Sequence, residues 1–248
     1  MNAAPCPRCG HRPGHADRDT HPGVCPACGI AIAKWKARAD TPAAMAGPQK
    51  HRDTQEISLL SRVNEQLLLP PEGMDATGSG ARAVLLGALG LWTLWFGMHG
   101  IDWEIIGGSF LHPANLAFHE FGHLFFMPFG ETMSILGGSL FQLLLPASLV
   151  GYFAVWRQDN IAAAVAAWWT GQNLVDLAPY IRDAEYRVLP LVGGGGEDSH
   201  DWGNLLSRWD AVAQCYALAR TSFGIGLLVM TAALLWGAAV LWRARRDA

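Results

Sequence analysis

Charged residues are scarce in this sequence. Asp, Glu, Lys and Arg together make up 16% of the chain, whereas about 25% is usual for a soluble globular domain. Hydrophobic residues make up 51% and are concentrated after residue 80, which exceeds what the core of a soluble domain of this length needs. The composition therefore argues against a purely soluble protein and favours helices placed in a membrane.

Two other features are also missing. Lys and Arg form no basic stripe and the formal net charge is −3, so no nucleic-acid partner is evident. The first residues lack an apolar core, so no cleavable signal peptide is expected. The expected partner is the lipid bilayer.

Cysteine is nearly confined to the start of the chain, where Cys6 and Cys9 form one Cys-x-x-Cys pair and Cys25 and Cys28 form a second. This spacing is typical of a structural zinc site, with two disulfides or a redox pair as alternatives. The glycine after each pair suits a tight turn that aims two thiolates at one ion. The sequence predicts a zinc ribbon over residues 1–36. Reduced thiolates place it on the cytoplasmic side, where its partner could be a protein, nucleic acid or its own membrane domain.

Residues 37–80 are rich in Ala, Pro, Gly and Thr and are interpreted as a linker. Within them, apolar residues recur at helical spacing and predict an amphipathic helix over 54–69, which lies on the membrane surface or packs on its neighbours. Long uncharged runs then cover residues 83–98, 136–156, 161–174 and 222–242. Residues 81–248 are therefore expected to form an all-α polytopic membrane helix bundle with about five to six spans, since each crossing needs about 20 apolar residues.

One motif indicates a reaction. His119-Glu120-Phe-Gly-His123 is a His-Glu-x-x-His pattern. On a helix, His119 and His123 share one face, so both imidazoles can reach a single metal ion. Glu120 lies beside them, where a carboxylate can accept a proton from a water molecule.

The motif helix is expected to be short, because Pro113 suits its first turn and Pro128 ends it. Fifteen residues cover only about 22 Å, less than the roughly 30 Å of the bilayer core. We therefore expect this helix to be buried among others. Ionisable groups at such a depth are costly, so they indicate a functional site.

A second polar cluster follows in the run after residue 160. Asn173, Asp176, Tyr180 and Asp183 would share one side of a continuous helix, although Pro179 predicts a break. A carboxylate from this segment could complete a metal site with the two imidazoles. Asp176 could instead serve only as a hydrogen-bonding group between helices.

The loop after this cluster contains Gly193–Gly196 and then His200. Four glycines could form a hinge that gates access, or could simply connect two helices. His200 is a further ligand candidate, but a solvated loop histidine is the preferred interpretation.

Together, the motif and the later Asn…Pro…Asp stretch resemble the site-2 protease family of intramembrane zinc metalloproteases. The resemblance covers roughly residues 110–185. In that family a later helix supplies an Asp as the third ligand. Asp183 matches by its order after Pro179 and is preferred here, although Ala184 stands where the family usually has Gly. Asp176 is the alternative third ligand, because it matches His123 in expected depth.

The resemblance implies a zinc metalloendopeptidase that hydrolyses a peptide bond of a membrane-embedded substrate. Glu120 would be the general base, Asn173 would help to hold the substrate, and His119, His123 and an Asp would hold a catalytic Zn²⁺ beside the structural Zn²⁺ of the ribbon. The alternative, from another class, is a non-catalytic membrane scaffold that binds metal or a partner through its ribbon. A zinc transporter is disfavoured, because Glu120 on a short buried helix indicates a closed site.

Overall fold

The computed structural model describes residues 4–12, 21, 23–34, 65–192, 196 and 199–246 of the 248-residue chain. The chain divides into two compact units, residues 1–57 and 58–248, and each is considered by itself. Most of the amphipathic helix expected over 54–69 lies outside the described residues; of its end, residues 65–67 are helical.

The described part of the first unit consists of two tight cysteine turns. The N–H of Gly10 donates to the carbonyl oxygen of Cys6, and the N–H of Gly29 donates to that of Cys25. Both glycines have φ near +70°, as expected for turns that only glycine adopts without strain. An isolated bridge pairs Val24 with Ala31.

The described part of the second unit is helical. Its elements are α3 (Ala76–His99), α4 (Trp103–Gly107), α5 (His112–Phe126), η3 (Met127–Phe129), α6 (Glu131–Gly151), η4 (Tyr152–Trp156), α7 (Asn160–Arg182), α8 (Asp201–Arg208), η7 (Val212–Gln214) and α9 (Cys215–Arg246). The motif helix α5 begins and ends where the two prolines predicted.

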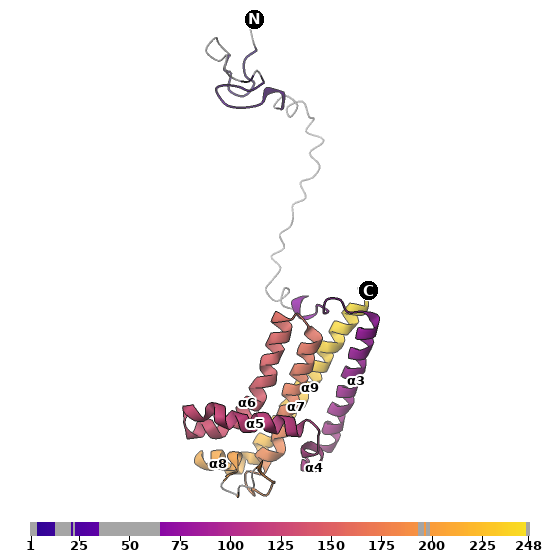
Figure 1. Ribbon diagram of the computed structural model, residues 1–248, viewed down its shortest axis with the longest axis vertical. Helices are drawn as coiled ribbons and strands as arrows, with labels where there is room; N and C mark the ends of the chain where they lie inside the picture. Colours follow the sequence, from indigo (N-terminus) through magenta and orange to yellow (C-terminus); the bar gives the residue numbers. More distant parts are fainter. Residues whose placement is uncertain are drawn as a thin grey trace. The chain divides into compact units, whose positions relative to one another are not determined.

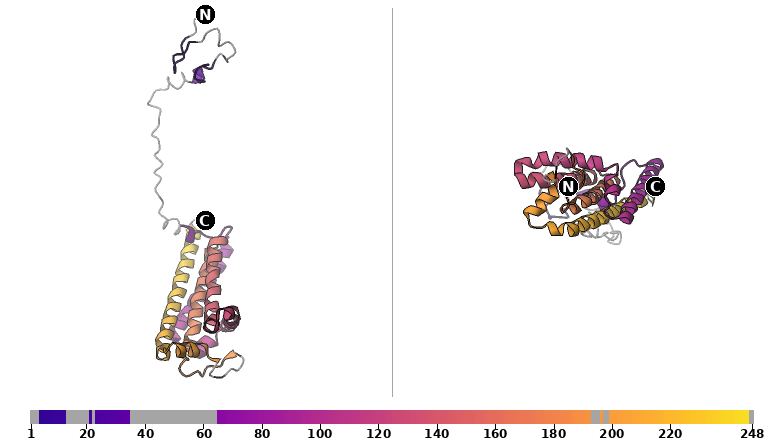
Figure 2. Two further views of the ribbon diagram at one scale, coloured as in Figure 1. Left: turned by 90° about the vertical axis from the view of Figure 1, so that its left-hand side faces the viewer. Right: turned by 90° about the horizontal axis from the view of Figure 1, so that it is seen from below.

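Helices α3, α7 and α9 lie lengthwise, whereas α5 lies across them (Figure 1). A view turned by 90° shows the segment of α5 end-on (Figure 2). The start of α3 and the end of α9 lie at one end of this unit, and α4, α8 and the loop before α8 lie at the other. The crosswise orientation of α5 brings its residues to the last turns of α7.

Three helical segments are long and apolar enough to cross a membrane: Ala76–His99, Glu131–Trp156 and Val212–Arg246. The expected count of about five to six spans is therefore not confirmed. Helix α5 has 15 residues and is too short to cross, as predicted. Only three of them, Asn115, His119 and Gly122, are buried, so the expectation that this helix is buried among others is wrong. Helix α7 is not among the three apolar segments, although it runs beside them.

The polar composition of α7 is explained by its burial. Fifteen of its 23 residues are buried, including Gln172, Asn173 and Asp176. Close contact with α9 depends on glycine: a Cβ atom on Gly171 would lie 2.7 Å from the carbonyl oxygen of Gly226. Because neighbouring helices cover α7, its polar groups are shielded from lipid and can bond with one another.

Gly171→Ala is expected to destabilise the helical unit by about 1–3 kcal/mol, because the added methyl group overpacks the contact between α7 and α9. Thermal unfolding of the purified chain would show a lower Tm. Gly151→Ala is the matched control, since a Cβ atom there meets no atom within 4 Å. Equal Tm values for the two variants would contradict this account.

Candidate metal centres and cavity

The four cysteines of the first unit form a cluster of the size that zinc requires. Cys6 Sγ lies 3.8 Å from Cys28 Sγ, and Cys9 Sγ lies 3.7 Å from Cys25 Sγ. A tetrahedron with Zn–S bonds of about 2.3 Å has edges of about 3.8 Å, whereas a disulfide needs about 2.05 Å. All four thiols are free. The cluster can therefore hold a zinc ion, and the disulfide alternative is not favoured.

The thiolate form is favoured at Cys6 and disfavoured at Cys28. The backbone N–H of Ile30 lowers the pKa of Cys28, but burial and the neighbouring thiols outweigh it and raise this pKa to about 12. The backbone N–H of Cys9 is the main cause that lowers the pKa of Cys6 to about 6. A thiolate, rather than a thiol, is the form that binds zinc.

In the second unit, His119 and His123 lie one turn apart on α5, with ring centroids 4.9 Å apart. Each ring is oriented through its Nδ1 atom. His123 Nδ1 lies 2.8 Å from the carbonyl oxygen of Ser134, and His119 Nδ1 lies 3.0 Å from Oε1 of Gln142. Since both partners accept, each Nδ1–H donates, and each Nε2 of a neutral ring carries a free lone pair. This second layer of bonds is typical of histidines that bind metal through Nε2.

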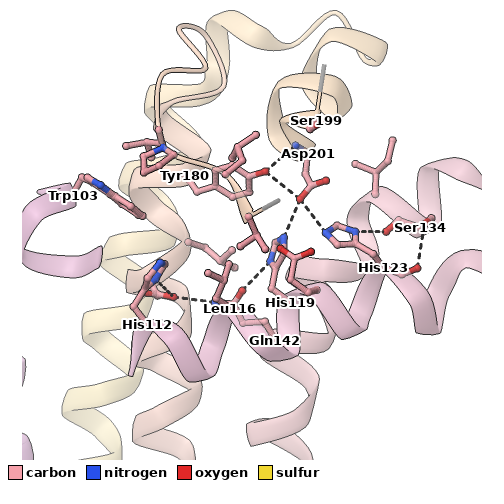
Figure 3. A pocket seen from close by; sticks show the side chains of 18 residues that line it. Trp103, His112, Leu116, His119, His123, Ser134, Gln142, Tyr180, Ser199 and Asp201 are labelled. Atoms are coloured by element: carbon pink, nitrogen blue, oxygen red, sulfur yellow. Dashed lines mark hydrogen bonds and ion pairs between the residues drawn. The ribbon is translucent and has the colours of Figure 1, made fainter. Parts of the chain in front are cut away.

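The carboxylate that meets the two rings is Asp201. Its Oδ2 atom lies 2.9 Å from Nε2 of His119 and 3.3 Å from Nε2 of His123, and the ligand atoms of the three residues lie within 4.8 Å of one another. Asp201 is the first residue of α8, after its N-cap His200. Figure 3 shows Asp201 reaching the imidazole pair from the segment that faces α5.

Three lone-pair atoms this close repel one another unless a positive charge lies among them. Burial disfavours a charged ring at His123, but the carboxylate of Asp201 outweighs it and raises the pKa of His123 to about 9. A proton can therefore supply the positive charge, and so can a metal ion that displaces it. Two imidazoles and one carboxylate, with room for a fourth ligand, form a donor set typical of catalytic zinc.

The structure does not place Asp176 or Asp183 in this group. Asp176 accepts hydrogen bonds from His112, Asn115 and Gln142, so it supports His119 only through Gln142. Helix α7 continues through Pro179 instead of breaking there. Asp183 therefore stays at the C-cap of α7 and does not fold back toward the imidazoles.

Asp183 and His200 lie next to each other near the start of α8. Asp183 accepts from the backbone N–H groups of Val188 and Leu189 and lies 3.3 Å from Nε2 of His200. Nδ1 of His200 accepts from the N–H of Gly203. The expected solvated loop histidine is thus a fully buried helix cap, and the pair fixes the start of α8, which carries Asp201.

Asn173, the expected substrate-holding residue, donates to the carbonyl oxygen of Trp169 in its own helix. Its side chain does not line the cavity beside the motif. Glu120 does line that cavity, next to the three-residue group.

The cavity has a volume of about 300 Å³. Its polar lining includes the three-residue group of His119, His123 and Asp201 together with Glu120 and Tyr180, as Figure 3 shows in part. Apolar side chains form much of the remaining lining: Trp103, Leu116, Ile135, Leu177, Leu189, Pro190, Leu191 and Val192. The cavity therefore joins Glu120 and the three-residue group to an apolar wall in one space.

Comparison of the chain with family models, with curated proteins and with solved structures gave no match. The site-2 protease resemblance therefore rests on the residues themselves.

Gly138 of α6 makes room for the imidazole pair. A Cβ atom there would lie 2.6 Å from Nε2 of His119 and 2.7 Å from Cε1 of His123. Gly138→Ala is expected to displace both rings and to weaken zinc binding at this site by about 10- to 100-fold, measured by competition with a zinc chelator. Gly224→Ala, where a Cβ atom meets nothing within 4 Å, should bind zinc as the wild type does. Unchanged affinity in the Gly138 variant would contradict the geometry.

The purified chain is expected to hold two zinc ions, counted by elemental mass spectrometry. Cys9→Ser and Asp201→Asn should each lower the count to one, because each removes a ligand from a different site. Asp102→Asn is the control, since this side chain only caps α4 and Asn caps equally well. A count of two in the Asp201 variant would show that Asp201 is not needed for zinc binding.

Proposed function

We propose that this chain is an intramembrane zinc metallopeptidase of site-2 protease type, which hydrolyses a peptide bond of a membrane protein substrate. The observation that carries the proposal is the convergence of two imidazole Nε2 atoms and one carboxylate oxygen on a cavity that Glu120 also lines. The scaffold alternative would be favoured by a missing third ligand, and Asp201 supplies one.

The residues of the site have separate roles in the proposed hydrolysis. His119, His123 and Asp201 would hold a zinc ion, which would lower the pKa of a water molecule and polarise a carbonyl group. Glu120 accepts the proton of the attacking water and passes it to the leaving amine. Gln142 and the carbonyl group of Ser134 keep the two rings oriented.

The apolar lining of the cavity supports an apolar substrate segment in an extended conformation. A substrate helix must unwind locally before it enters, because the hydrogen bonds of a helix shield its amide groups. The apolar side chains of Leu189–Val192 then replace the lipid contacts that the substrate side chains lose.

The arrangement of helices supports a multi-pass membrane protein. If α7 crosses with the three apolar segments, the chain returns to the side on which α3 began, since α5 does not cross. The basic end of α9, with Arg243, Arg245 and Arg246, favours the cytoplasm for that side. A cytoplasmic ribbon with reduced thiolates agrees with this topology, and there it can bind a protein partner.

Glu120→Gln is expected to keep zinc and to abolish cleavage, because the amide cannot accept the proton of water. Membranes from cells that produce the wild type or the variant would be compared by mass spectrometry of newly formed protein N-termini. The wild type should produce termini within or beside apolar segments, and these should be absent from the variant.

Glu104→Gln is the matched control, since Glu104 lies on α4 and does not line the cavity; its termini should equal those of the wild type. The same set of termini in the Glu120 variant would remove the peptidase proposal.

A further inference from the structure

We propose that Tyr180 is the hydrogen-bond donor that stabilises the negative charge developing on the substrate carbonyl oxygen. The inference rests on the proposed peptidase function. It makes Tyr180 a catalytic residue that keeps its own proton throughout the reaction, so the proton balance at Glu120 is unchanged.

The position of Tyr180 carries the inference. It lies in the last turn of α7 and lines the same cavity as Glu120. Its hydroxyl group donates to Oδ2 of Asp201 at 3.1 Å, the oxygen that also contacts both imidazoles. The phenol oxygen is therefore one hydrogen bond away from the metal-binding group, where the oxygen of a substrate carbonyl would be placed.

The phenol oxygen of Tyr180 is held in place by its neighbours, whereas its proton can rotate. The backbone N–H of Asp201 donates to this oxygen at 2.9 Å, and the ring packs against that of His200 at 4.4 Å between centroids. Rotation about the C–O bond redirects the proton without moving the oxygen. When a cation occupies the lone pair of Oδ2, the proton can turn to a substrate oxygen. Because the oxygen is already held in place, only the proton has to turn before the hydroxyl group can stabilise a developing charge.

Several other polar side chains of the cavity form hydrogen bonds to groups other than Asp201. The amide of Gln142 bonds Asp176, and the Ser134 hydroxyl donates to the carbonyl oxygen of His123. His112 bonds Asp176 through Nδ1 and lies two helical turns from His119, about 10 Å along the axis. Asn173, which the family resemblance suggested for holding the substrate, is turned to its own helix. Tyr180, by contrast, donates directly to Oδ2 of Asp201.

The test compares two ligands of the zinc-loaded full chain in detergent, by isothermal titration calorimetry. An N-phosphoryl-leucyl peptide presents charged oxygens where the carbonyl oxygen would develop its charge. A thiol-bearing leucyl peptide binds zinc through sulfur and presents no such oxygen. Tyr180→Phe is expected to weaken the phosphoryl ligand by about 10- to 100-fold, the usual effect of losing a hydrogen bond to a charged group, and to leave the thiol ligand unchanged.

Tyr152→Phe is the control, because Tyr152 is exposed and lies in η4, at the far end of α6; both affinities should equal those of the wild type. Equal binding of the phosphoryl ligand by the Tyr180 variant overturns the inference. Weakening of both ligands together with zinc loss also overturns it, since Tyr180 would then only position Asp201. A zinc-loaded wild type that binds neither ligand overturns the proposed function itself.

Discussion

One electrostatic constraint governs the candidate site of the helical unit: the Nε2 atoms of His119 and His123 and a carboxylate oxygen of Asp201 lie close together. Without a positive charge between them, this arrangement is repulsive in a partly buried place. The contacts around it keep the three groups together in spite of that cost. Each ring is oriented through Nδ1, and the start of α8 is fixed by the buried pair of Asp183 and His200. The fold thus prepares a site for a cation.

Burial explains the polar residues of α7. Gln172 and Asp176 would be costly on a lipid-facing helix, whereas α7 is enclosed by α6, α9 and α5. Asp176 accepts hydrogen bonds from side chains of α5 and α6. These bonds connect the crosswise motif helix to the lengthwise bundle. A close glycine contact between α7 and α9 holds this enclosed helix in place.

Local patterns predicted the features that depend on local geometry. The Cys-x-x-Cys turns follow from short spacing, and α5 follows from two prolines and an i, i+4 histidine pair. The carboxylate that meets the two imidazoles was not predicted, for two physical reasons. Asp176 was favoured because parallel helices would place it at the same depth in the membrane as His123. Helix α5 lies across α7, however, so the number of residues along one helix does not give the position along the other. Order after Pro179 favoured Asp183, but burial keeps α7 helical through that proline. Asp201 follows a glycine-rich stretch, whose sequence does not fix where the next helix lies. The one available signal was an acidic residue at the start of a short helix after His200.

The position of Asp201 in the chain has a consequence for biosynthesis. Glu120 and the two histidines emerge from the ribosome early, whereas Asp201 follows only after α6 and α7. Under the proposed function, a partly inserted chain holds the base and two ligands but cannot close the site. Hydrolytic capacity would then arise only once α8 has docked.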